Sequence, residues 1–209
     1  MSNFSTPRDS PSDDSDGPRS PSYYGDMTYP TVTPQSDRRA EVVRAAIRAF
    51  ARKGYGGTTL ADIAVEAGVS QPRISQIFGN KETAFLQAQQ VASDEVLEVL
   101  GAHAGPPYSV ERIAAGYRPM IADRPEILQM VIQMMTSSYV PSIREASQRY
   151  VNEIIRLVTE QAGGTMADAV DLLSRGFFFN AMLLVDAHGS SESYPEMNQA
   201  LEAVSRQLN

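Results

Sequence analysis

The sequence contains no cysteine and only two histidines, His103 and His188. The absence of cysteine excludes disulfide bonds and thiolate metal sites, and neither histidine has a second ligand at a metal-binding spacing. Arg, Asp or Glu interrupts every apolar stretch before it reaches the length of a membrane span. The sequence also shows no paired carboxylates and no nucleophile–base set. We therefore expect neither an enzyme nor a membrane protein, and we expect no metal or cofactor.

Residues 1–36 differ in composition from the rest of the chain. They are rich in Ser, Pro and Asp and nearly lack aliphatic side chains, so they cannot bury enough apolar surface to fold. We expect a disordered tail here. The first residues also lack the basic start and apolar segment of a signal peptide, which predicts a cytoplasmic protein.

The net charge of −7 is distributed unevenly. Residues 1–36 contain two Arg and five Asp, and residues 82–209 contain eight Arg and sixteen acids, whereas residues 37–81 contain eight basic and four acidic side chains. A compact basic segment joined to an acidic body is typical of a small nucleic-acid-binding domain with a second domain attached. A solvated, arginine-rich helix face would give the same composition, and charge alone does not decide between these alternatives.

Helical periodicity dominates the chain after residue 36, and no alternating strand pattern occurs. We predict an all-α protein with a three-helix, helix-turn-helix DNA-binding domain over residues 37–82 and a second helical domain over residues 83–209. Capping residues, glycines and prolines mark about nine helices, which we expect at 37–53, 60–67, 71–78, 81–102, 109–122, 125–138, 141–161, 167–187 and 194–208.

Two short helices joined by a tight turn are expected between residues 60 and 78. Thr59 and Asp62 have the spacing of a capping box, with Asp in place of the usual Glu, and Gly68 stops the first helix. Ser70 is expected to cap the second helix, with Pro72 in its first turn. A glycine-containing turn lets the second helix cross the first steeply, which defines a helix-turn-helix. The small core behind it is predicted to contain Ile63, Ala64, Val69, Ile74 and Phe78.

The second of these helices carries polar side chains that we expect to be exposed: Gln71, Arg73, Ser75 and Gln76. In the major groove, Arg pairs with guanine and Gln pairs with adenine. Thr59 and Lys81 lie at the N-termini of two neighbouring helices, where backbone N–H groups favour phosphates. The pattern therefore predicts a helix that enters a DNA groove, although solubilising groups on an exposed helix are the alternative.

The stretch from Arg38 to Phe85 resembles the N-terminal domain of the TetR family of one-component transcription regulators. The matching segments are Arg38-Arg39-Ala40-Glu41, Gly54-Tyr55-Gly56-Gly57-Thr58-Thr59-Leu60-Ala61-Asp62-Ile63-Ala64, Ala67-Gly68-Val69-Ser70 and Phe78-Gly79-Asn80-Lys81-Glu82. The resemblance implies a homodimer that places its third helices in the major groove of a palindromic, double-stranded DNA operator. It also implies that residues 83–209 form an effector-binding and dimerisation domain whose two C-terminal helices build the dimer interface. Most members are repressors that a small molecule releases from DNA, through a shift of the fourth helix.

Carried over to this sequence, the resemblance places DNA contacts at Thr59, Ser70, Gln71, Pro72, Arg73, Ser75, Gln76 and Lys81. Many members have an aromatic residue where this chain has Ser75, and His or a similar residue where it has Ile77, so the operator sequence is not transferable. The departure at Ser75 favours the alternative function, a helical dimeric ligand-binding or interaction protein that has lost specific DNA binding.

Methionine and aromatic side chains in the second domain are candidates for the effector pocket that the resemblance implies. We single out Tyr117, Met130, Met134, Tyr139, Phe178 and Met182. Adaptable methionines and flat aromatic rings suit a pocket, but methionine at helical spacing is also typical of core packing. Asn180 lies in an apolar helix, where it could orient a ligand or face solvent or the partner subunit.

Overall fold

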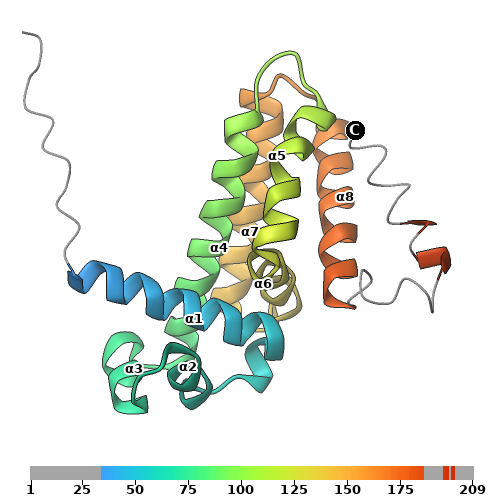
Figure 1. Cartoon of the computed structure of the whole chain (residues 1–209). Coiled ribbons are helices and arrows are strands. Elements are labelled where there is room, and N and C mark those ends of the chain that lie inside the picture. Colours follow the sequence, from blue (N-terminus) through green and yellow to red (C-terminus); the bar gives the residue numbers. More distant parts are fainter. Residues whose placement is uncertain (1–33, 186–194, 198, 201–209) are drawn as a thin grey trace, which may run out of the picture. The chain divides into compact units, whose positions relative to one another are not determined.

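The computed structural model describes residues 34–185, 195–197 and 199–200. Within these residues the protein is helical and contains no strand, which confirms the predicted fold class (Figure 1). The predicted tail lies almost entirely outside the described residues, and so does most of the helix expected at 194–208. The elements are α1 (Pro34–Gly57), α2 (Leu60–Ala67), α3 (Gln71–Phe78), α4 (Lys81–His103), α5 (Val110–Asp123), α6 (Pro125–Thr136), α7 (Pro141–Arg156), the π-helical turn η1 (Leu157–Gln161) and α8 (Met166–Leu184).

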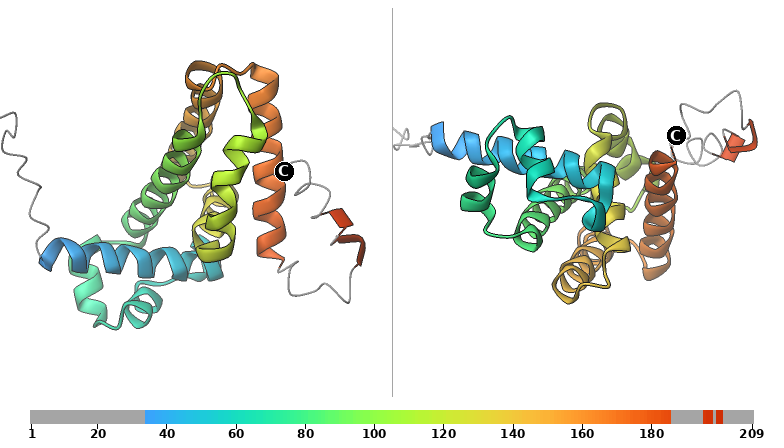
Figure 2. Two further views of the ribbon diagram at one scale, coloured as in Figure 1. Left: turned by 45° about the horizontal axis from the view of Figure 1, so that its top comes forward. Right: turned by 90° about the horizontal axis from the view of Figure 1, so that it is seen from below.

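Helices α1, α2 and α3 form a small domain, which we call the head, and α4–α8 with η1 form the body. In both side views α1 crosses the base of the body, and α2 and α3 lie on the opposite side of α1 (Figures 1 and 2). Helix α4 begins at the head and continues through the body, so the predicted boundary at residue 82 falls in its first turn. The head is thereby connected to the body through a continuous helix.

The helix-turn-helix has the predicted bounds because local signals fix both ends of its helices. Thr59 and Asp62 form a complete capping box at the start of α2, and Gly68 adopts the left-handed conformation that ends it. Ser70 occupies the N-cap position of α3, but its side chain makes no capping hydrogen bond there. Asn80 caps α4 by accepting a hydrogen bond from the backbone N–H of Thr83 at 2.8 Å.

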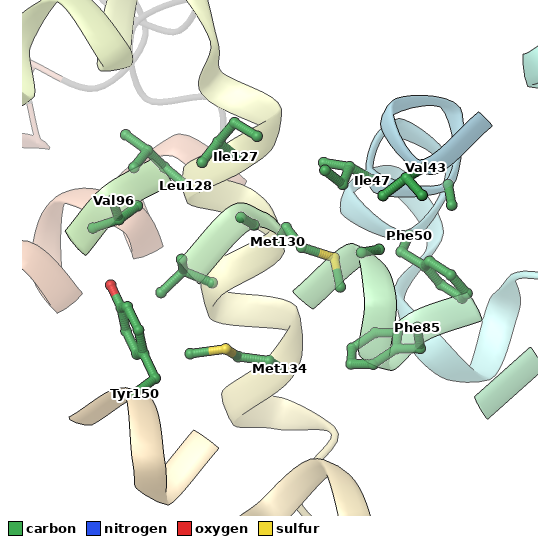
Figure 3. Packing of buried hydrophobic residues seen from close by; sticks show 14 of the residues in the cluster. Val43, Ile47, Phe50, Phe85, Val96, Ile127, Leu128, Met130, Met134 and Tyr150 are labelled. Carbon is green, nitrogen blue, oxygen red and sulfur yellow. The ribbon is translucent and has the colours of Figure 1, made fainter. Parts of the chain in front are cut away.

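One apolar core extends from the head into the body. Phe50 of α1 meets Phe85 of α4 edge to face, with ring centroids 4.9 Å apart. Met130 and Met134 of α6 belong to the same core and are almost completely buried (Figure 3). Ile63, Ala64, Ile74 and Phe78 are buried as predicted. Head and body are therefore packed against each other rather than tethered by a linker.

Two expectations about burial in the head are wrong. Val69 is 36% exposed, because the left-handed Gly68 turns the chain outward before α3 begins. Ser75 is half-buried on the flank of α3, since it lies beside the buried Ile74 and away from the exposed face. The exposed face of α3 is therefore narrower than the sequence predicts.

Candidate functional site

The first turn of α2 is fixed by reciprocal hydrogen bonds between Thr59 and Asp62. Thr59 donates from its backbone N–H and its hydroxyl to Asp62 Oδ2 at 2.8 and 2.6 Å, and Asp62 N–H donates back to Thr59 Oγ1 at 3.1 Å. Lys53 also donates to the Asp62 carboxylate at 2.5 Å. The hydrogen bonds from Lys53 and then from Thr59 hold the pKa of Asp62 well below its usual range. Thr59 thus secures the helix end that we expect to meet a phosphate.

Helix α3 presents a polar face to solvent. Gln71, Pro72, Arg73 and Gln76 are exposed, while Ile74 and Phe78 anchor the opposite side of the helix in the core. Arg73 Nη1 lies 3.4 Å from Gln76 Oε1, at the long limit of a hydrogen bond, so neither side chain is firmly held. Both groups are accessible to an incoming ligand.

The basic residues of the head divide into two groups. Arg48 and Arg52 share the carboxylate of Glu66, and Lys53 pairs with Asp62, so two carboxylates offset most of the charge of these three cations. A second group forms no ion pair with the residues that the structure describes, and it contains Arg38, Arg39, Arg44, Arg73 and Lys81. This second group supplies the positive charge that an anionic partner would meet.

A polar cleft of about 530 Å³ separates the first turns of α1 from α3. Arg38, Arg39 and Arg73 line it, together with Gln76 and the exposed Val69. Arg39 also donates to Gln87 of α4 at 2.9 Å. Three arginines against one lining carboxylate, Glu41, give the cleft a net positive charge, which suits phosphates.

Lys81 is held at the base of the body by an aromatic side chain. Its Nζ lies 4.6 Å from the ring centroid of Tyr55, which is close enough for a cation–π interaction. Tyr55 in turn meets Phe85 at 5.2 Å and Tyr139 at 6.5 Å between ring centroids. Burial and then the nearby Glu82 raise the pKa of Tyr55. The sequence offered no sign that Tyr139 would reach this end of the molecule.

The body contains a cavity of about 80 Å³ between α8 and helices α4–α7. Its wall is mostly apolar, and its polar side chains are Tyr117, Tyr150, Arg175 and Asn180. The remaining lining residues are Val96, Leu100, Ala114, Val131, Met135, Ile154, Leu172, Leu173, Gly176, Phe177 and Phe179.

Of the six residues predicted for an effector pocket, only Tyr117 lines this cavity. Met130 and Met134 lie in the continuous core. Helix α6 ends at Thr136, two residues earlier than predicted, so the 66% exposed Tyr139 belongs to the next turn and faces Tyr55. The remaining two, Phe178 and Met182, pack in a small cluster around Ala114 and Phe179.

Asn180 is the polar residue of α8 whose role the sequence left open, and it is 3% exposed. Its Oδ1 accepts a hydrogen bond from the Tyr117 hydroxyl at 3.0 Å. Burial raises the pKa of Tyr117 and also that of Tyr150, so both hydroxyls keep their protons at neutral pH. The cavity therefore contains hydrogen-bond donors in apolar surroundings.

Other kinds of site find no support in the described part of the chain. No group of three or more His, Asp or Glu side chains lies close enough there to hold a metal ion. None of the described helices is both long and apolar enough to cross a membrane.

One protein family has a sequence model that matches the head and the start of α4. The sequence model of the family described as "Bacterial regulatory proteins, tetR family" matches residues 42–88, from α1 into α4. A comparison with curated protein sequences gave no match.

Solved structures match most of the chain, at sequence identities that show the fold alone. A TetR-like transcriptional regulator from Rhodococcus sp. RHA1 is 19% identical, with a TM-score of 0.59 over 84% of this chain and 96% of its own. A TetR family member from Streptomyces coelicolor A3 is 17% identical, with a TM-score of 0.57 over 83% and 99%. The multidrug binding protein EbrR complexed with imidazole is 18% identical, with a TM-score of 0.56 over 83% and 90%. Residues 42–88 thus carry the helix-turn-helix segment of the tetR family of bacterial regulatory proteins, and the described chain around it has the fold of these solved structures.

Proposed function

We propose that the protein is a homodimeric transcriptional repressor, which binds a palindromic DNA operator and leaves it when a small molecule binds to the body. The exposed face of α3 carries this proposal. It presents Gln71, Arg73 and Gln76 next to basic residues that form no ion pair within the described chain. Since operator DNA lies in the cytoplasm of a bacterium, the proposal also assigns the protein to that compartment.

Each DNA contact has a physical role in this proposal. Arg73 and Gln76 supply a guanidinium and an amide that can read base edges in the major groove. Lys81, Thr59, Ser70 and the half-buried Ser75 lie at helix ends or flanks, where contacts to phosphates position the protein. Pro72 fixes the start of α3, since its ring favours helical geometry in the first turn.

An apolar stripe on α8 supports the homodimer. Met166, Val170, Phe177 and Leu184 are all more than one-third exposed. Their spacings of four and seven residues place them on one face of the helix, at 100° per residue. A second copy of the chain would cover this stripe through a two-fold interface. The helix expected at 194–208 is the other proposed part of that interface, and it lies mostly outside the described residues.

The cavity in the body supports a response to small molecules. The structural relative EbrR was solved with imidazole and with malachite green, so a protein of this fold holds small molecules. In this chain the cavity lies between α8 and α4–α7, and α4 leads directly to Lys81 and the head. A ligand that spreads these helices would change the position of the head on DNA.

A mobility-shift titration tests DNA binding. The full chain is titrated on DNA from upstream of its own gene at roughly 50 and 200 mM salt, because phosphate contacts make affinity fall with salt. Arg73→Ala should weaken specific binding by about 5- to 100-fold, which corresponds to the free energy that one bidentate contact to a base contributes. Arg149→Ala is the matched control, since Arg149 is exposed on α7 and pairs only with its neighbour Glu145.

Absence of a specific shift on this DNA would contradict binding near the gene itself. Selection of bound fragments from the whole genome then decides the wider question. If that selection is also empty while the protein is a dimer by light scattering, the protein is a dimeric ligand-binding protein without specific DNA binding.

A further inference from the structure

Two hydrogen-bond donors at the wall of the cavity have no partner among the described residues. The Tyr117 hydroxyl is engaged with Asn180 Oδ1 at 3.0 Å, which leaves the amide N–H groups of Asn180 unpaired. The Tyr150 hydroxyl likewise forms no hydrogen bond within the described chain. Its ring extends from α7 with the oxygen directed towards Val96 of α4, another lining residue (Figure 3).

Both residues are almost completely buried, but neither donor atom is fully enclosed by protein, so both reach the space of the cavity. Asn180 is 3% exposed and Tyr150 is 6% exposed. A buried donor without a partner costs free energy, and such groups are rare in folded proteins. Both residues line the same cavity, so the two donors border the space that an occupant would fill.

The remaining wall limits the charge of the occupant. Among the described residues no carboxylate lines the cavity, so a cation would find no counter-charge there. The one cationic lining residue, Arg175, already donates to Asp171 at 2.7 Å. Transfer of an uncompensated charge into apolar surroundings is strongly unfavourable, which favours a neutral occupant.

The volume limits the size of the occupant. A volume of about 80 Å³ corresponds to roughly five to eight water-sized positions, which suits a single ring better than a larger molecule. Gly176 borders the same space, and a Cβ atom added there would meet nothing within 4 Å. A side chain at this position would therefore extend into open space without displacing the helix.

Building on the proposed response to small molecules, we propose that the cavity binds a neutral, single-ring compound with one carbonyl-type oxygen. That oxygen accepts hydrogen bonds from the Asn180 amide and the Tyr150 hydroxyl, while the apolar wall surrounds the ring. Tyr117 is a positioning residue, because its hydroxyl holds the Asn180 amide in the orientation that presents the N–H groups.

Three matched probes test this chemistry on the full chain without DNA, by calorimetry or ligand-detected NMR. Acetophenone has the ring and the carbonyl, ethylbenzene has a similar shape without the oxygen, and benzoate carries a charge. We expect acetophenone to bind at least about fivefold more tightly than ethylbenzene, because one additional hydrogen bond contributes about that much affinity. We expect benzoate not to bind.

Variants assign the preference to the two donors. Tyr150→Phe and Asn180→Leu should each reduce the preference for acetophenone while ethylbenzene still binds. Gly176→Leu should prevent binding of both probes by filling the space. Tyr108→Phe is the control, because that hydroxyl bonds to the backbone of Asp168 outside the cavity and should leave the preference unchanged. If Asn180→Leu fails to fold, the nearly isosteric Tyr150→Phe alone tests whether a donor at the cavity wall causes the preference for acetophenone.

Equal affinity for acetophenone and ethylbenzene in the wild-type protein would overturn the proposal, as would no binding of any probe. A preference that survives both donor variants would overturn it as well. Release of DNA is measured separately on the same samples. Acetophenone binding that leaves DNA affinity unchanged would therefore contradict the ligand response in the proposed function and leave the binding site established.

Discussion

Glu66 accepts hydrogen bonds from two arginines of α1, and this arrangement makes the stability of the head depend on pH. Arg48 Nε lies 2.6 Å from its carboxylate, and Arg52 bonds the other oxygen. These two hydrogen bonds, Arg48 first, lower the pKa of Glu66 from its ordinary value of 4.5. A carboxylate with a lowered pKa stabilises the fold above its ordinary pKa, and the stabilisation is lost as pH falls through the lowered pKa.

We therefore predict that the thermal midpoint of the wild-type protein falls as the pH drops below about 4.5, and that Glu66→Gln reduces this fall. Circular dichroism melts across that range provide the measurement. Glu145→Gln, which removes an exposed carboxylate from α7, should keep the wild-type dependence. Identical pH profiles for Glu66→Gln and the wild type would rule out this role of Glu66.

Gly54 combines a backbone requirement with a close contact. Its φ of 68° and ψ of 176° lie in a region that essentially only glycine adopts, and a Cβ atom there would lie 2.9 Å from Gln133 Oε1 of α6. Gly54→Ala should lower the free energy of unfolding by about 1–2 kcal/mol because of backbone strain alone. Displacement of the Gln133 side chain should increase this loss. Gly56→Ala is the matched control, because its Cβ would meet nothing. Urea unfolding of both variants tests this, and equal losses would contradict it.

The interruption of the helical conformation at Gly54, inside α1, could be predicted from the sequence, because a glycine after a basic, amphipathic helix commonly marks a helix end. The contact with Gln133 could not, since it joins residues far apart in the chain and depends on how α6 packs on α1. Thr58 contacts a residue only four positions away, yet this contact was not predictable either. Its buried hydroxyl donates to the Gly54 carbonyl at 2.7 Å, and no residue nearby in the sequence indicates this bond.

At the scale of elements, the turn between α6 and α7 contacts the start of α4. The ring of Tyr139, from this turn, contacts the ring of Tyr55, which in turn makes the cation–π contact with Lys81. Ser142, at the start of α7, donates a hydrogen bond to the Glu82 carboxylate at 2.5 Å. A movement of α6 or α7 would therefore change the surroundings of Lys81, which we expect to bind phosphate.

Tyr139→Ala should weaken operator binding by about two- to fivefold, because Tyr55 loses its neighbour and Lys81 loses its fixed position. Tyr139→Phe keeps the ring contact and should bind as the wild type does. Fluorescence anisotropy on labelled operator DNA measures both affinities. If Tyr139→Ala binds as tightly as Tyr139→Phe, the turn does not influence Lys81.

The bounds of α2 and α3 were predictable to the residue, because Thr59, Gly68 and Pro72 start or end a helix through contacts and backbone preferences within one helical turn. The candidate DNA contacts followed from the same local pattern, and the structure places them at one end of the molecule. The cavity lining was not predictable. Met130 and Tyr139 are residue types that commonly line pockets. Met130 is buried in the core instead, and Tyr139 lies near the head because α6 ends early.

At the scale of the whole molecule, the proposed dimer interface on the apolar stripe of α8 would determine how two copies share one operator. Two heads on one dimer bind a palindrome together, and the second contact is intramolecular once the first is made. Half-sites about one helical turn, or somewhat more, apart are expected from this geometry. Dimerisation and operator affinity should therefore be lost together.

Val170→Glu tests this coupling, because it places a charge in the centre of the stripe while Val170 is already 54% exposed and contributes little to the core. We predict a monomer by sedimentation, with affinity for the full palindrome reduced by about 100-fold or more, since bivalent binding is lost. Affinity for an isolated half-site should stay within about twofold of the wild type, because α3 and Lys81 are unchanged. Gln148→Glu adds the same charge at an exposed position on α7 and should remain dimeric. A Val170→Glu protein that stays dimeric would exclude the stripe as the interface, whereas a monomer with full affinity for the palindrome would show that each head binds DNA independently.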